Sequence, residues 1–489
     1  MATIPKEVVP VVAPTTASQK SSNSTPSNNK SNKYSDGFSK YNQLKIEEFW
    51  LYRMYDGKAS DKDKWIDIRP FHLELNIFED LTVQTLSAQL ILSDAANLPD
   101  RFPIVGGERV KIKYKSTAEE ESKELVFVVY KIGERKKSND QSKNQSYVLF
   151  LCTEDRWLDS NLDISKAYSG TYSSIVKDCL NELQTIRPLD AEESETNCGF
   201  ISPYWSPLRS VKFCAKRAIN GKQSPFIFWE TMNGYNFKSV SSIYSEVPFK
   251  SIYIEPRLQK ANIESLEKSL NTVIRFEFKE SNNKLEQYSN GTYGSRIFYF
   301  DIGTKKVELA EIDYRNSFKE SESHIEEFPL TDDMANVRKK NTIAISMNDG
   351  SHKSKYIRNM ILDHIANYKV LVHLPGDTNI NAGKTLYFEI PAMSNMFSGY
   401  QKEVLTSGKW LIASVRHRIG RETYDAFAEL IKDSHKVDIQ ESVYGKTKEE
   451  INEEDIKRKE IPTEVMPSIK IDEQTVGTQN FEGTEFTDD

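Results

Sequence analysis

Apolar and polar residues alternate in three short stretches of the chain, at 73–77, 88–92 and 109–114. Alternation with a period of two places successive side chains on opposite faces of a β-strand, one of them packed on a core. Segments rich in Asp, Asn, Pro and Gly separate the three stretches and favour turns, at 93–97 and 103–107. The pattern predicts an antiparallel β unit, either a small barrel or a sandwich.

The same pattern returns near the other end of the chain. After Gly107 the sequence reads ERVKIKY, and after Gly383 it reads KTLYFEI. The strands predicted next, at 125–132 and 410–419, end in Ile-Gly-Glu-Arg and Ile-Gly-Arg-Glu, and each precedes a strand that opens on Tyr. This correspondence predicts two copies of one β domain; a chance match between short strands is the alternative.

The residues between the two β patterns have a different character. Apolar residues form a helical stripe at 172–183, with either Thr171 or Ser173 as the N-cap. A second helix is expected from Ser206 as N-cap, through Pro207 in the first turn, to Gly221 beyond its end. The stretch FIFWETMNGYNFKSVSSI then predicts a β-hairpin that turns at Asn233-Gly234. Helices beside a hairpin indicate an α+β domain.

These patterns divide the chain into six parts. The polar N-terminal arm lacks the apolar residues needed to offset ordering entropy and is expected to be disordered, whereas the acidic C-terminal tail is interrupted by Phe481 and Phe486, which suggest a docking segment. The predicted parts are the arm 1–40, a β domain 41–163, an α+β domain 164–260, strands and a polar excursion 261–345, a second β domain 346–435, and the tail 436–489.

Composition narrows the class of protein. Hydrophobic residues make up 38% of the 489, charged residues 28%, and the net charge is −7. A net negative chain is not suited to grip phosphate backbones, so tight binding of DNA or RNA is not expected. No apolar run approaches the roughly 18–20 residues that span a bilayer, and we expect synthesis in the cytosol. The four widely spaced cysteines favour buried thiols over a disulfide framework or metal site.

No catalytic constellation or cofactor motif emerges from the sequence. Phosphate loops, nucleophile elbows and zinc-protease motifs do not occur. Adjacent acidic residues are frequent, but sequence spacing cannot place two of them in one cleft, as glycosidase chemistry requires. Trp205, Trp229 and Trp410 could line a sugar site, yet each lies where a core aromatic residue is expected. We therefore predict no catalytic residue, metal or cofactor.

Six segments in a fixed order resemble the baseplate hub proteins of contractile-tailed bacteriophages, over about 44–434. They are ELNIFEDL…LSAQLILSDAANLPDRFPIVGGERVKIKY, WSPLRSVKFCAKRAI, FIFWETMNGYNFKSVSSI, GTYGSRIFYFDIGTKK, VLVHLPGDTNINAGKTLYFEIP and SGKWLIASVRHRI…YDAFAELIKDS. The two tails and the polar stretch 311–349 lie outside the likeness.

The resemblance implies a structural virion protein with an α+β, mainly antiparallel β fold, in which two related tube-like β-barrel domains flank the α+β domain. Three copies would form a pseudo-hexameric ring that connects a six-fold tail tube to a three-fold spike. The implied location is the tail baseplate of a virion assembled in the host cytoplasm. The implied partners are other copies of the chain, a separate spike protein, the tail tube protein, the tape-measure protein and wedge or neighbouring hub proteins, with DNA only in transit through the channel.

No short motif of the family defines interface residues, so the predicted tube-wall or interface residues rest on strand position. They are Arg109, Lys111, Lys113, Trp410, Arg416 and Arg418. A solvated strand face is the alternative for them. For the whole chain, a carbohydrate-binding or cell-wall-hydrolysing tail component is the alternative function. A tube-terminating or tube-initiating ring is a third, against which the helical middle domain argues.

Overall fold

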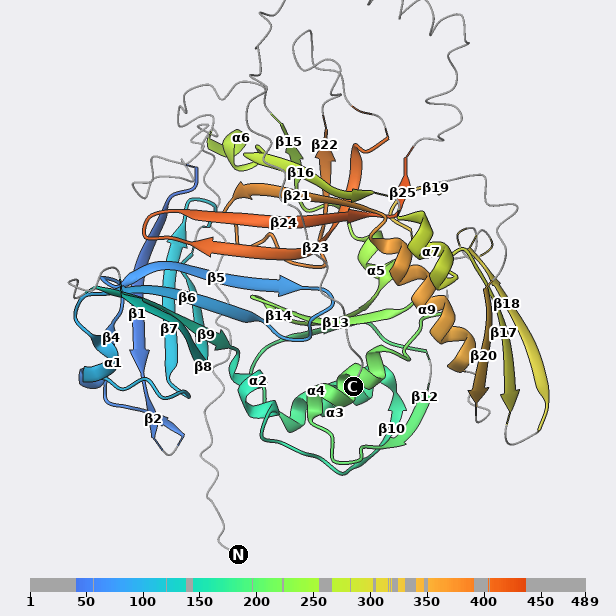
Figure 1. Ribbon diagram of the computed structural model, residues 1–489, viewed down its shortest axis with the longest axis horizontal. Helices are drawn as coiled ribbons and strands as arrows, with labels where there is room; N and C mark the ends of the chain where they lie inside the picture. The colour runs from blue at the N-terminus through green and yellow to red at the C-terminus, as the bar shows by residue number, and fades with distance from the viewer. Residues whose placement is uncertain are drawn as a thin grey trace, which may run out of the picture.

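A computed structural model describes residues 41–436 of the chain, apart from 56, 120, 138–143, 196, 222–223, 255–265, 282, 302–304, 315, 317, 319–323, 330–339, 347–350, 391–402 and 404. Strands from both ends of this range join in one 13-stranded sheet. The middle domain and a three-stranded arm lie at its borders (Figure 1). The fold is mainly antiparallel β with some helices, as predicted.

The first half of the sheet comes from the residues before the middle domain. Its strands follow the spatial order β5-β6-β9-β8-β7-β1-β4, and neighbours pair antiparallel. The elements are β1 Leu44–Tyr52, β4 Ile66–Asp67, β5 His72–Asp80, β6 Ser87–Asp94, α1 Leu98–Arg101, β7 Arg109–Ser116, β8 Lys123–Lys137 and β9 Gln145–Cys152, with the short β2 Met54–Tyr55, β3 Lys58–Ala59 and η1 Lys62–Lys64 beside β1.

The second half repeats this order with strands from later in the chain. The path β16-β21-β24-β23-β22 corresponds to β5-β6-β9-β8-β7, and β15 lies beside β22 as β1 lies beside β7. The orientation of that last pair differs, since β15 runs parallel to β22. The strands are β15 Ser251–Tyr253, β16 Arg275–Ser281, β21 Tyr368–Pro375, β22 Thr385–Glu389, β23 Gly408–Ile419 and β24 Tyr424–Lys432.

Each half encloses its own apolar core. In the first half, Phe49 and Leu51 of β1 pack with Leu75 and Ile77 of β5. In the second, apolar residues of β21, β23 and β24 pack with those of β15 and β22 around Trp410, which is fully buried. The path from β16 to β4 does not close on itself within the described residues, so the predicted barrels are not confirmed.

One strand joins the two halves. The N-terminal part of β23 pairs with β22, and its C-terminal part pairs antiparallel with β5, from Ser414 opposite Asp80 to Ile419 opposite Leu75. A bulge between Ile412 and Ser414 separates the two parts. A bulge bends a strand and increases its local twist, which allows β23 to follow two partners in turn.

The middle domain combines helices with the predicted hairpin. Thr171 caps α3, since its hydroxyl accepts from the Ser174 amide, and Pro207 begins α4 after Ser206. The helix α4 ends at Ala215, earlier than the stop predicted at Gly221, and Ile219 instead bridges to Pro225. The elements are α2 Glu154–Asp159, β10 Ala167–Thr171, α3 Tyr172–Glu182, β11 Leu189–Ala191, β12 Asn197–Ile201, α4 Pro207–Ala215, β13 Phe226–Thr231, β14 Gly234–Ser239 and α5 Val240–Ser245.

The residues between β16 and β21 form the arm and the helix that connects it to the sheet. The sheet of the arm has the order β18-β17-β20. The polar, charge-rich composition of 311–349 predicts a long exposed excursion, but Ile312, Tyr314 and Ile325 within it are buried against α9. The remaining elements are α6 Leu266–Leu270, α7 Lys284–Asn290, β17 Gly294–Asp301, β18 Val307–Asp313, β19 Phe328–Pro329, β20 Lys340–Ser346, α9 Ser351–Ile365 and β25 Ser434–His435. No helix in the described ranges is long and apolar enough to cross a membrane.

We expect Trp410→Ala to destabilise the protein by about 3–5 kcal/mol, because it leaves a cavity in the core of the second half. It also removes the indole donor, which lies 3.0 Å from the Thr406 carbonyl oxygen. Urea unfolding of the full chain measures the loss. Val105→Ala is the control, since Val105 is 82% exposed and its truncation should change the free energy of unfolding by less than about 0.5 kcal/mol. Equal effects of the two substitutions would contradict the assigned core.

Candidate functional site

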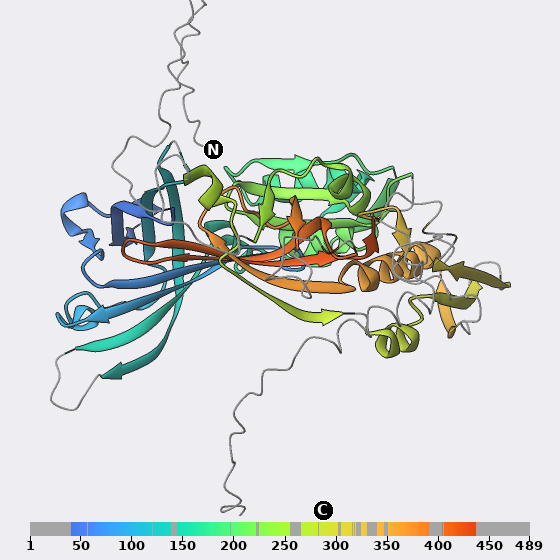
Figure 2. The ribbon, with the colours of Figure 1, turned by 90° about the horizontal axis from the view of Figure 1, so that it is seen from above.

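The shared strands of the two halves present one face that carries charged and polar side chains. Side chains alternate along each strand, so this face is opposite to the two apolar cores. The helix α9 packs over one end of it, against Leu411 and Ile431. Figure 2 shows β8 and β16 extending to the side of the shared strands away from the middle domain. The face includes Glu74, Asn76 and Phe78 of β5, Ser414, Arg416 and Arg418 of β23, and Asp425, Phe427 and Glu429 of β24.

Charges of both signs pair across the strands of this face. Arg416 donates from Nη2 to Glu74 at 2.9 Å and from Nε to Asn76 Oδ1 at 2.7 Å. Arg418 lies 3.7 Å from Glu74 and 3.5 Å from Asp425. The side chains of Arg416 and Arg418 remain 44% and 38% exposed. The face is therefore charged and hydrated, but it does not concentrate one sign of charge.

Asp425 connects this network to β21. Its carboxylate lies 3.3 Å from His373 Nε2 and accepts from the Asn42 amide at 3.4 Å. Burial acts to raise the pKa of Asp425, but hydrogen bonds from His373 and Asn42, with the charges of His373 and Arg418, leave it below its usual value. The carboxylate thus stays ionised and holds β24, β21 and β23 in one polar network.

The predicted interface residues occupy different environments. Arg416 and Arg418 lie on the charged face. On β7, Arg109 pairs with Glu154, Lys111 with Glu48 and Glu124, and Lys113 with Glu47. Trp410 is buried in the core and offers no surface in the single chain. Phe481 and Phe486 lie outside the described residues. A tube-wall or interface role for these residues, and a docking role for the two phenylalanines, stay predictions.

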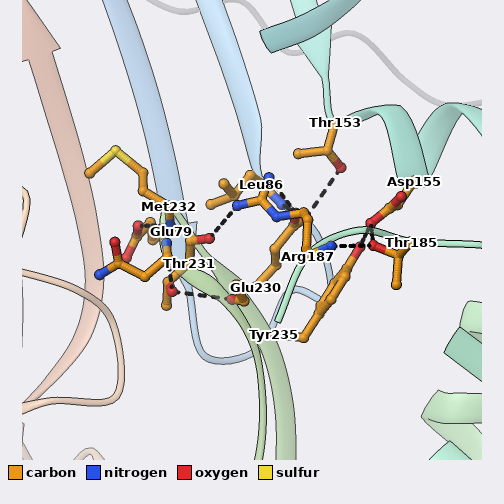
Figure 3. A network of polar contacts seen from close by, with 12 residues as sticks. Glu79, Leu86, Thr153, Asp155, Thr185, Arg187, Glu230, Thr231, Met232 and Tyr235 are labelled. Carbon is orange, nitrogen blue, oxygen red and sulfur yellow. Dashed lines mark hydrogen bonds and ion pairs between the residues drawn. The ribbon is translucent and has the colours of Figure 1, made fainter. Parts of the chain in front are cut away.

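Two buried glutamates fasten the middle domain to the sheet (Figure 3). Glu79, at the end of β5, accepts from the Met232 amide at 2.7 Å, the Ala382 amide at 3.0 Å and the Asn381 side chain at 3.3 Å. These donors come from the turn of the hairpin and from the loop before β22. Burial raises the pKa of Glu79 to about 7, although each hydrogen bond favours the charged form.

Glu230 makes the second joint, from β13 of the hairpin. It accepts from the Leu86 amide at 2.8 Å and from Thr153 at 3.2 Å, and it pairs with Arg187 at 3.1 Å. Burial raises its pKa to about 7 as well, against the opposing charge of Arg187. Beside it, the Tyr235 hydroxyl donates to Asp155 at 2.9 Å. Both glutamates therefore satisfy backbone donors of other elements.

Sequence reasoning missed both glutamates. The available signal was a glutamate within FIFWET, an otherwise apolar strand, and another that ends the β5 stretch. A buried carboxylate in such a position needs hydrogen-bond donors, but the donors lie far away in the sequence. Glu79, for example, binds Ala382 across 303 positions.

The tryptophans considered for a sugar site have packing roles. Trp229 and Trp410 are buried, and Trp205 contacts Phe213 and Arg209. Within the described ranges no group of three His, Cys, Asp or Glu side chains could hold a metal ion. The four cysteines are free thiols there, and three of them are buried.

Comparison with known proteins adds a sequence relative. The probable baseplate hub protein gp334 of Vibrio phage KVP40 is 20% identical over 392 residues, which cover 74% of this chain and 89% of that protein. The resemblance to phage baseplate hub proteins inferred from the sequence is thereby confirmed. No protein-family model matches the chain.

Two solved structures of tail proteins are also similar. The tail protein from Neisseria meningitidis MC58 aligns with a TM-score of 0.48 and 10% identity, and the alignment covers 79% of this chain and 97% of that one. The 43 kDa tail protein of prophage MuSo2 from Shewanella oneidensis aligns with a TM-score of 0.48 and 11% identity, covering 79% and 98%. At this level of similarity neither structure assigns a function.

The raised pKa of Glu79 implies that the free energy of unfolding depends on pH. Burial raises this pKa in the folded protein to about 7, from the usual 4.5 of a glutamate, so the folded state binds the proton more tightly than the unfolded state. The wild type should therefore lose stability as pH rises from about 4.5 to 7, by up to about 3 kcal/mol from this group. Glu79→Gln removes this dependence, although the amide cannot accept from all three donors and lowers stability overall.

Urea unfolding between pH 5 and 8 measures the difference between wild type and Glu79→Gln. The control is Glu121→Gln, an exposed glutamate whose substitution should leave the pH profile of the wild type unchanged. Parallel profiles for wild type and Glu79→Gln would show that Glu79 does not titrate between the two states.

Proposed function

We propose that this chain is a structural baseplate hub protein, three copies of which form a ring around a channel. The relationship to a phage baseplate hub protein supports the class. The observation that best supports the ring is the joint between β23 and β5, which connects two halves of equivalent strand order within one chain. A contact of the same kind can connect one chain to the next.

Two strand edges are open at the positions that this contact requires. In the first half, β8 corresponds to β23; it pairs with β7 only up to Val128, and no described strand lies on that side of 131–137. In the second half, β16 corresponds to β5 and is paired only with β21 in the described part of the chain. Unpaired strand edges favour association with another strand.

The strand ladders predict the register of this contact. One bulge of β8 lies between Val129 and Lys131, and that of β23 between Ile412 and Ser414, each directly after the first partner strand ends. Aligning these two bulges places Lys131 at the position of Ser414. A second bulge of β8, between Gly133 and Lys136, then places Lys136, which lies opposite Ser146, at the position of Arg418, which lies opposite Asp425. The ladders from β5 to β6 and from β16 to β21 place Glu277 at the position of Asn76.

Arg418 lies opposite Asn76 in the joint within the chain. By the same geometry, Lys136 of one copy lies opposite Glu277 of the next, which places opposite charges across the strands. Such a head-to-tail contact forms a closed ring when the rotation that relates neighbouring copies is a whole fraction of a full turn. Three copies supply six equivalent halves, which suits a connection between a six-fold tail tube and a three-fold spike.

In the proposed ring the charged face of the sheet lines the channel. Its arginines are paired with Glu74 and Asp425, so the wall offers little excess positive charge to a phosphate backbone. Binding of DNA depends on such excess charge and on the counterions that it releases. The tape-measure protein and then DNA can pass through such a wall without being retained.

The chain acts in this proposal by assembly rather than by catalysis. Its partners are other copies of itself, a separate spike protein, the tail tube protein and wedge or neighbouring hub proteins. Its place is the tail baseplate of a virion assembled in the host cytoplasm. Large interfaces transmit the contraction load, and no bond-breaking chemistry is needed.

A disulfide tests both the contact and its register. We expect the variant Lys136→Cys/Glu277→Cys to form covalent dimers and trimers on mild oxidation, because the two positions lie opposite each other across neighbouring copies. Denaturing electrophoresis without reductant measures the species. Both cysteines are introduced into a chain that carries Cys198→Ser, because Cys198 is the one partly exposed native thiol in the described residues.

The matched control is Lys136→Cys/Lys58→Cys, which pairs the same β8 position with an exposed lysine of β3. It should stay monomeric on the gel. The proposed contact fails if the first variant also stays monomeric, both alone and mixed with a spike protein, or if its products extend well beyond three chains.

A further inference from the structure

A groove lies between α4, α9 and one end of the sheet. Its volume is about 420 Å³. Apolar side chains form much of its wall, among them Leu81, Phe228, Leu362 and Ile365. The cationic residues of the wall are Lys212, Lys216, Arg358 and Lys369, and the acidic ones are Asp80 and Glu429. An apolar wall with more positive than negative charge fits an anionic ligand that has an apolar group.

Three cations of the groove, Lys212, Lys216 and Arg358, form no ion pair with a described residue. Arg358 donates to the carbonyl oxygens of Ala215 at 2.9 Å and Phe226 at 2.6 Å, and no described carboxylate forms an ion pair with it. Its burial without such a partner lowers the pKa of the guanidinium to about 10. Lys212 and Lys216, one helical turn apart, are exposed, and neither forms an ion pair with a described residue.

The acidic residues of the wall do not balance this excess. Asp80 already accepts hydrogen bonds from the amide and the hydroxyl of Thr82, both at 2.6 Å. Glu429 is the second acidic residue of the wall, and neither acidic residue forms an ion pair with Lys212, Lys216 or Arg358. An opposite charge within a few ångström favours the charged form of a cationic side chain. The groove therefore has unsatisfied capacity for carboxylates.

The last residues of the sequence have the matching chemistry. Residues 481–489 read FEGTEFTDD, with Phe481 and Phe486 among four acidic residues and no basic one. The other apolar stretch of the tail, 465–471, contains Lys470 and fits the cationic wall less well.

The described chain ends close to β21, the strand that supplies Lys369 of the groove wall. The His435 ring lies 5.6 Å from the ring of Tyr368, and the next residue, Lys369, lines the groove. About 45 residues separate this end from Phe481, and a coil of that length spans roughly 35–40 Å. The segment can therefore reach the groove of its own copy or that of a neighbour.

We propose that this groove binds the acidic segment 481–489 of the chain itself. A phenylalanine of the segment packs against the apolar wall, and its carboxylates pair with Lys212, Lys216 and Arg358. The proposal does not depend on the ring, because the groove and the segment are present in every copy.

A labelled peptide of residues 479–489 tests the proposal by fluorescence anisotropy. The full chain with Phe481→Ala/Phe486→Ala leaves the groove vacant, and the peptide should bind it with an affinity that falls as salt increases. The wild type should bind the peptide at least tenfold more weakly, because its own segment competes at a high effective concentration.

Charge reversal locates the site. Lys212→Glu/Lys216→Glu, added to Phe481→Ala/Phe486→Ala, should weaken peptide binding at least tenfold, whereas Lys62→Glu/Lys64→Glu on η1 is a matched control without effect. A peptide with both phenylalanines replaced by alanine should also bind at least tenfold more weakly. The proposal is overturned if the peptide does not bind the vacant groove, binds wild type equally well, or ignores the Lys212/Lys216 reversal.

Discussion

The antiparallel pairing of β23 with β5 is the contact on which the rest of the structure depends. It joins two halves, each with its own core, into one sheet of 13 strands. The bulge after Ile412 permits this, because it lets β23 leave β22 and continue beside β5. The charged face exists because the two halves share this sheet, and Arg416 connects the strands of both across it.

Buried carboxylates set the position of the middle domain relative to that sheet. Glu79 and Glu230 each accept backbone donors from elements that are distant in sequence. Complete burial of the Glu79 carboxylate is costly despite the nearby charge of Lys384, and the raised pKa of Glu79 reflects this cost. The directional hydrogen bonds in return fix the hairpin against β5 and the loop before β22, which apolar contacts alone would specify less sharply. This arrangement suits a protein that is proposed to transmit load between domains.

Local patterns in the sequence predicted the local structure well. The alternation at 73–77, 88–92 and 109–114 lies in β5, β6 and β7, and the caps Thr171 and Ser206 precede α3 and α4. These features depend on neighbours along the chain. The order of the strands in the sheet depends instead on contacts between distant residues. The strands β9 and β8 lie between β6 and β7, and no periodicity in the sequence shows this order. The early end of α4 and the burial of Tyr314 likewise depend on contacts with distant residues.

The candidate site was only partly predictable for the same reason. Arg416 and Arg418 were identified from alternation, but their partners Glu74 and Asp425 follow from strand pairing that sequence spacing does not reveal. Lys111 and Lys113 have carboxylate partners on the neighbouring strands β1 and β8. The two open edges, on β8 and β16, became visible only when the strand orders of the two halves could be compared.

The mass of the full chain in solution, alone and mixed with a candidate spike protein, tests the central claim most directly. A ring joined through β8 and β16 predicts a species of three chains, either alone or in a complex of three chains with three spike chains. A chain that remains monomeric at high concentration and in the presence of the spike would contradict the account.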